Sequence, residues 1–124
     1  MKPAVALLLA ACAVSPAAAT ELAGPPLDPP ALNQRLVAAV EKAEGMSDGL
    51  SIRGLKKSLA RNGSGYCGEA SRGGGPYLPF HVLLDADGTS SVLLAPDGSK
   101  PNPLLTPADA TRMLENFGCM GAGP

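Results

Sequence analysis

The sequence predicts a small α+β protein with an N-terminal helix, an antiparallel meander of about four short strands, a C-terminal helix and one disulfide. Three observations lead to this fold class. Apolar residues recur at helical spacing near both ends of the chain, whereas short apolar runs separated by Asn-Gly and Asp-Gly turns occupy the middle. Only two of the three cysteines remain once an N-terminal signal is removed. The length of 124 residues is that of one domain.

Residues 1–19 have the pattern of a secretory signal peptide. Lys2 gives a positive start, residues 4–14 form an apolar run, and the alanines at 17–19 supply the small residues that a signal peptidase needs. We therefore expect cleavage after this stretch and a periplasmic or secreted mature protein. As an alternative, the small residues before Cys12 resemble a bacterial lipoprotein site, where lipidation would anchor the chain to a membrane.

The mature chain is expected to begin with a lead-in and a helix. Residues 20–30 are rich in proline and lack periodicity, so they predict a flexible lead-in to a single domain of residues 31–124. Asp28 is the expected N-cap of the first helix, and Gly45 directly after Glu44 is its expected stop. The apolar stripe of this helix consists of Leu32, Leu36, Ala39, Val40 and Ala43.

Four short strands are predicted after the first helix. They cover residues 51–60, 65–70, 78–84 and 91–95. Asn62-Gly63 and Asp87-Gly88 are typical hairpin turns, and the Gly-rich stretch 71–76 is a loop between the second and third strands. Tight turns between consecutive short strands favour an antiparallel meander.

The C-terminal helix is marked at both ends. Thr106 is its expected N-cap, Pro107 suits the first position, and Gly118 is the expected terminator. Because Cys119 follows directly, this helix would deliver a thiol to the edge of the core. A bond to Cys67 would close a loop of about fifty residues, which is worth about 4 kcal/mol in the chain-entropy model. Oxidising compartments favour such pairing.

Charge and composition limit the classes of partner. Removal of the signal takes Lys2 away and shifts the formal charge from −1 to −2, so no strong field favours nucleic acid or an anionic membrane. We expect no nucleic-acid binding, no membrane insertion after signal removal, and a monomer. Four cations lie within nine residues, either as a contact for an anionic partner or as a solvated strand with protective lysines: Arg53, Lys56, Lys57 and Arg61.

The predicted binding surface adds Tyr77 and His81 to these cations. His81 alternates with Phe80 and Val82 on a strand, so it is expected to face solvent or a shallow groove if those two residues face the core. It is the sole histidine of the chain. A disulfide-bonded Cys67 cannot act as a nucleophile, and we expect no metal, no cofactor and no catalysis.

The stretch from Phe80 to Thr89 carries an alternative. An apolar strand that runs into Asp-x-Asp-Gly-Thr resembles the first motif of the haloacid dehalogenase superfamily, in which the first Asp attacks a phosphoryl group. The resemblance implies an Asp-dependent phosphohydrolase that uses Asp85 and Asp87. That fold requires a parallel sheet with crossover helices and a later Lys, whereas a hairpin turn explains the same residues without them.

A second resemblance covers less than half of the mature chain. Residues 66–70 (Tyr-Cys-Gly-Glu-Ala), a Gly-rich loop, Tyr77 and Pro79-Phe80 resemble small exported bacterial proteins of uncharacterised function with a C-terminal Cys. The usual Val-Asn is replaced here by Ala70-Ser71. The resemblance implies export and a cysteine pair. We expect a non-catalytic envelope protein that binds an unknown envelope protein or ligand; alternatively, Cys12 makes it a lipid-anchored structural component.

Overall fold

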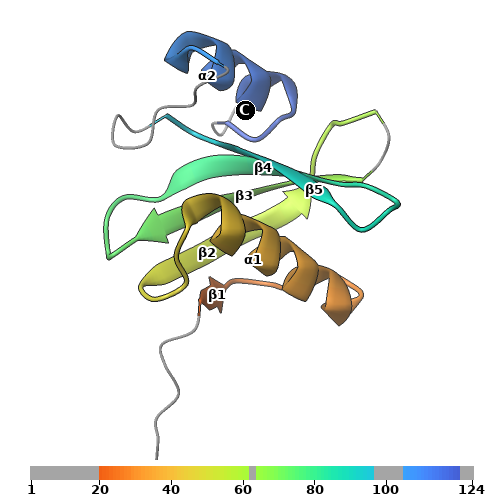
Figure 1. Ribbon diagram of the computed structural model, residues 1–124, viewed down its shortest axis with the longest axis vertical. Helices are drawn as coiled ribbons and strands as arrows, with labels where there is room; N and C mark the ends of the chain where they lie inside the picture. Colours follow the sequence, from red (N-terminus) through yellow and green to blue (C-terminus); the bar gives the residue numbers. More distant parts are fainter. Residues whose placement is uncertain (1–19, 62–63, 97–104, 121–124) are drawn as a thin grey trace, which may run out of the picture.

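The computed structural model describes residues 20–61, 64–96 and 105–120, which form an α+β fold. A five-stranded mixed sheet carries one helix on each face (Figure 1). The elements are β1 (Glu21–Ala23), α1 (Pro30–Glu44), β2 (Leu50–Lys57), β3 (Gly65–Arg72), β4 (Leu78–Leu84), β5 (Ser90–Leu94) and α2 (Pro107–Asn116). The predicted fold class is confirmed in outline, and the sheet differs in detail.

The main correction concerns β1, a strand inside the predicted flexible lead-in. The strand order is β1-β2-β3-β4-β5, and β1 pairs in parallel with β2, with Glu21 beside Ser51. The other neighbours are antiparallel, as the meander prediction requires. A three-residue strand is too short to show periodicity, and this one is held through its partner. The hydroxyl of Thr20 also donates to the side chain of Glu41 on α1.

The remaining strand boundaries are close to those expected. β4 has the predicted bounds, β2 ends three residues early, and β3 continues to Arg72, so the predicted loop at 71–76 begins inside a strand. Ser71 donates its hydroxyl to the Gly75 carbonyl at 2.7 Å, which closes the turn that follows. The predicted turn at 62–63, the signal peptide and Cys12 lie outside the described residues.

The predicted cap of α1 is wrong. The N-cap is Pro29 rather than Asp28, and no side chain caps it. Asn33 on the first turns satisfies the backbone of the lead-in instead: Leu27 N–H donates to Asn33 Oδ1, and Asn33 Nδ2 donates to the Leu27 carbonyl, both at 2.8 Å. The helix ends at Gly45, with φ of 73°, as predicted.

The larger core lies between α1 and the sheet. Leu36 and Val40 on the helix, Ile52 on β2, and Phe80 and Val82 on β4 are all 0% exposed. Burial of each such side chain contributes about 1.5–3 kcal/mol. This core confirms most of the predicted apolar stripe of the first helix, whereas Ala43 is half-buried and lies outside the core.

A smaller core lies on the opposite face, under α2. The hydroxyl of Thr106 accepts from Asp109 N–H at 3.1 Å, which confirms the predicted cap. Ala110 and Leu114 are buried against β4 and β5. Neither of the two helices that the structure describes is long and apolar enough to cross a membrane.

Candidate functional site

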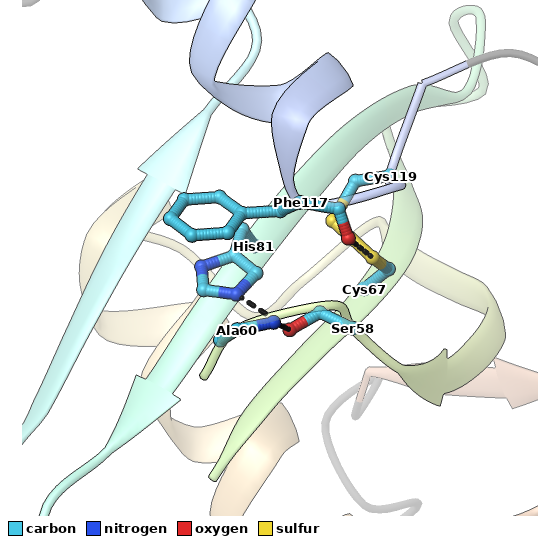
Figure 2. Close-up of a disulfide and its surroundings, with 6 residues drawn as sticks. All are labelled: Ser58, Ala60, Cys67, His81, Phe117 and Cys119. Carbon is cyan, nitrogen blue, oxygen red and sulfur yellow. Dashed lines mark hydrogen bonds between the residues drawn. A yellow bond between two sulfur atoms is a disulfide. The ribbon is translucent and has the colours of Figure 1, made fainter. Parts of the chain in front are cut away.

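The two cysteines of the predicted pair are joined beside α2. Cys67 in β3 is bonded to Cys119, 52 residues later, with a Cα–Cα distance of 5.1 Å (Figure 2). Their exposed fractions are 1% and 8%. The bond fixes the C-terminal end of α2 to the central strand of the sheet, and it removes Cys67 as a nucleophile.

The histidine ring lies under the end of α2. The rings of His81 and Phe117 stack with centroids 3.9 Å apart and an interplanar angle of 9° (Figure 2). The Phe117 carbonyl accepts a hydrogen bond from Leu59 N–H at 2.9 Å, and this bond holds Phe117 in place. The same carbonyl oxygen lies 3.7 Å from Cys67 Sγ. His81 points away from Phe80, as expected, but the expectation that it faces solvent or a groove is wrong because Phe117 covers it: only 4% of His81 is exposed.

His81 also forms a hydrogen bond with Ser58, a residue that sequence reasoning missed. Ser58 Oγ lies 2.9 Å from His81 Nε2 and accepts from Ala60 N–H at 3.1 Å. Burial lowers the pKa of His81, which favours the neutral ring. Nε2 of a neutral ring can then accept the Ser58 proton. Among the described residues no carboxylate forms a hydrogen bond with the other ring nitrogen.

Gly65 is the residue that makes room for this pair. A Cβ at this position would lie 2.7 Å from His81 Nε2 and 2.7 Å from the Ala60 side chain. Both distances are shorter than any normal contact. The glycine of β3 is therefore a packing requirement of the bond between Ser58 and His81.

Arg53 and Tyr77, two members of the predicted binding surface, contact each other, and Glu69 pairs with the same arginine. Arg53 and Glu69 are direct cross-strand partners, and Arg53 Nε lies 2.8 Å from Glu69 Oε1. The Arg53 guanidinium lies over the Tyr77 ring, 3.7 Å from its centroid. We call these three side chains the arginine cluster. Because Glu69 and Cys67 are two residues apart on β3, the cluster lies on the same face of the sheet as α2.

The other predicted cations are divided between the faces. A register shift between Arg53 and Lys56 brings Lys56 opposite Cys67 and Lys57 opposite Tyr66. Lys56 therefore shares the face of the arginine cluster, whereas Lys57 lies on the face of α1. Arg61 is exposed after the strand. The predicted surface is thus only partly gathered in one place, and His81 is buried under Phe117.

The two aspartates of the phosphohydrolase alternative lie in the turn between β4 and β5. Thr89 Oγ1 is 3.0 Å from Asp85 Oδ2 and 2.7 Å from Asp87 Oδ1, and Thr89 N–H donates to Asp87 Oδ1 at 3.0 Å. Hydrogen bonds from the Thr89 side chain and backbone lower the pKa of Asp87. The adjoining strands are antiparallel rather than parallel, so the geometry is that of the hairpin turn that the sequence also allows.

Comparisons with known proteins add no homologue from which a role could be transferred. No protein-family model, no curated protein and no solved structure matches the chain. Within the described ranges no group of three or more His, Cys, Asp or Glu side chains is placed to hold a metal ion.

Proposed function

We propose that this is an exported, disulfide-stapled protein of the bacterial envelope that binds a partner protein and catalyses no reaction. The observation that carries the proposal is the arginine cluster of Arg53, Glu69 and Tyr77 on a sheet face that α2 shares. Helix α2 packs on β4 and β5. The cluster lies on and beside β2 and β3, next to the disulfide that holds α2 in place.

The cluster has the properties of a preorganised contact surface. Arg53 is held from two directions, by an ion pair with Glu69 and by the ring of Tyr77, yet its side chain stays 49% exposed. Arginine and tyrosine are enriched among residues that dominate protein–protein binding. A side chain that is already ordered loses less entropy when a partner binds.

The polar surface continues from the cluster along the first strands. Ser51 Oγ lies 3.3 Å from Glu21 Oε1. Ser51 lies two residues from Arg53, so it shares the same face. Hydroxyl and carboxylate groups around a central arginine and tyrosine resemble the polar rim and anchored centre of a protein interface.

The burial of His81 supports a structural rather than a catalytic role for the smaller core under α2. A general base must reach its substrate. His81 is covered by Phe117 on one side and bonded to Ser58 at its edge, and Cys67 is in a disulfide. A lipid at Cys12 would make the protein a lipid-anchored component, and it leaves this binding role unchanged.

Site-specific photocrosslinking in cells tests the binding proposal. Lys56 shares the face of the arginine cluster and Lys57 is its neighbour on the other face, so a photoreactive amino acid at each position gives a matched pair. We expect a crosslinked adduct from position 56 that Arg53→Glu abolishes, and a weaker adduct from position 57. Equal adducts from both positions, or an adduct that Arg53→Glu leaves unchanged, would refute the proposed surface.

A further inference from the structure

An open groove separates α1 from β5, on the face opposite to the arginine cluster. It has a volume of about 830 Å³. Small side chains line it on the helix, among them Ala38, Ala39 and Ala43, and Leu84 and Val92 lie on the sheet side. Because alanine side chains fill little space, α1 does not cover the β5 edge of the sheet at this groove.

Among the residues that the structure describes, no strand pairs with the outer edge of β5, so its backbone groups are available at this groove. Asp85 N–H donates to the Thr89 carbonyl at 2.9 Å, and Ala95 N–H donates to the Pro79 carbonyl at 3.1 Å. In an antiparallel pair the direction of these bonds alternates along the strand. The backbone groups of Ser91 and Leu93 therefore point to β4, and those of positions 90, 92 and 94 point outward. Within the described residues β5 is the last strand of the sheet.

The two edges of the sheet are protected very differently. At one edge, β1 pairs with β2 only at residues 51–53. The part of β2 that follows contains Lys56 and Lys57, and its pairing with β3 shifts register next to Gly54. Charged residues and bulges are usual devices against unwanted strand pairing. β5 has the sequence Ser-Ser-Val-Leu-Leu, without charge, proline or bulge. An unprotected edge of this kind is a template for an added strand.

Two cations lie along the groove. Arg35 and Lys42 on α1 both line it, and the residues that line it include no carboxylate. They are exposed, and the described part of the chain gives neither of them an ion-pair partner. Seven residues of helix separate them by about 10 Å. Alternate residues of an extended strand share one face and lie about 7 Å apart, so two of them lie within reach of these two long side chains.

We propose that the groove between α1 and β5 binds an extended acidic segment of a partner protein, which pairs with the outer edge of β5. The segment's backbone bonds to the outward groups at positions 90, 92 and 94. Its alternate side chains face α1, where carboxylates meet Arg35 and Lys42. Addition of a strand to a sheet edge is a general mode of peptide recognition. This site lies on the face opposite to the arginine cluster and is independent of it.

Peptide titration of the isotope-labelled full chain tests this inference. The probe is a capped peptide of about six residues, the usual strand length, in which glutamate alternates with valine. The comparison peptide has lysine in place of glutamate. We expect the glutamate peptide to shift amide signals of β5 and α1, and the double substitution Arg35→Glu and Lys42→Glu to weaken binding at least about tenfold. Lys57→Glu is the matched charge reversal outside the groove and should leave binding unchanged.

A second pair of variants tests the strand pairing. Ser90→Pro removes an outward N–H, a change that an edge strand tolerates, whereas Ser90→Ala keeps it. We expect Ser90→Pro to weaken the peptide and Ser90→Ala to leave it unaffected, with both variants folded. The inference is overturned by equal binding of the lysine peptide, by binding that Ser90→Pro or the Arg35 and Lys42 reversal leaves intact, or by no binding at all.

Discussion

The ring of His81 in β4 lies parallel to the ring of Phe117 at a centroid distance of 3.9 Å, beside the disulfide from Cys67 to Cys119. This stack joins the end of α2 to the sheet in a core that contains few large side chains.

Removal of the disulfide should destabilise the protein strongly. The double variant Cys67→Ala and Cys119→Ala no longer closes a loop of 52 residues, and the chain-entropy model assigns about 4 kcal/mol to that closure. Urea denaturation of the oxidised wild type, the reduced wild type and the variant should place the last two close together. A variant within about 1 kcal/mol of the oxidised protein would show that the bond contributes little.

Stability should fall on mild acidification because of His81. Burial lowers its pKa in the folded protein below the unfolded value of about 6.5. The unfolded state therefore binds the proton first, and stabilisation that is complete above that value is lost as the pH falls toward the folded pKa. The free energy of unfolding should decrease by at most about 1.4 kcal/mol per pH unit for this one proton.

The control for this pH dependence is His81→Gln, which removes the titrating group. Denaturation of both proteins between about pH 7 and pH 5, the range in which unperturbed histidine titrates, should give a flatter profile for the variant. Identical slopes would assign the acid sensitivity to other groups.

Gly65→Ala should disrupt the bond between Ser58 and His81. The new methyl group would lie 2.7 Å from His81 Nε2, so a side chain or the strand must move. We expect a loss of about 1–3 kcal/mol, the usual cost of overpacking. Ser58→Ala removes the hydrogen bond without the clash and should cost about 1 kcal/mol.

NMR measures the effect of both substitutions on the His81 ring. The Ser58→Ala and Gly65→Ala variants should both change the chemical shifts of the His81 ring, and Gly65→Ala should also shift Phe117. A Gly65→Ala variant as stable as the wild type, with an unchanged His81 ring, would show that this position has room.

Substitution within the arginine cluster should affect binding far more than folding. Arg53→Ala removes an ion pair whose side chains are 49% and 42% exposed, and such pairs contribute about 0–1 kcal/mol. Thermal denaturation should therefore change little, whereas crosslinking from position 56 should fall. Strong destabilisation by Arg53→Ala would instead make the cluster a structural element.

Local signals were sufficient to predict several elements of the fold. The bounds of β4, the Thr106 cap of α2 and the Gly45 end of α1 follow from strand pattern and capping chemistry, and they agree with the structure. The cysteine pairing was predicted from the number of cysteines outside the predicted signal peptide, and the structure contains that pair. For the strand and the helix ends, the physical cause lies within a few residues of the feature. For the disulfide, it lies in the number of cysteines.

Features that depend on distant residues were missed. β1 exists because β2 is beside it, and the lead-in to α1 is held by hydrogen bonds between Asn33 and Leu27 rather than by a cap from Asp28. His81 is buried by Phe117, which is 36 residues later in the sequence, so alternation gave its direction and not its exposure. Strand alternation describes one sheet face but not what covers it.

The central claim is that the protein is exported and joined by a disulfide between Cys67 and Cys119. The intact mass of the protein recovered from its native compartment tests this claim most directly. We predict the mass of residues 20–124 less two hydrogens, with the two hydrogens regained on reduction. A lipid-modified chain that begins at Cys12 would identify the anchored form of the same exported protein. A chain that keeps Met1 and contains free thiols at Cys67 and Cys119 would contradict both export and the disulfide.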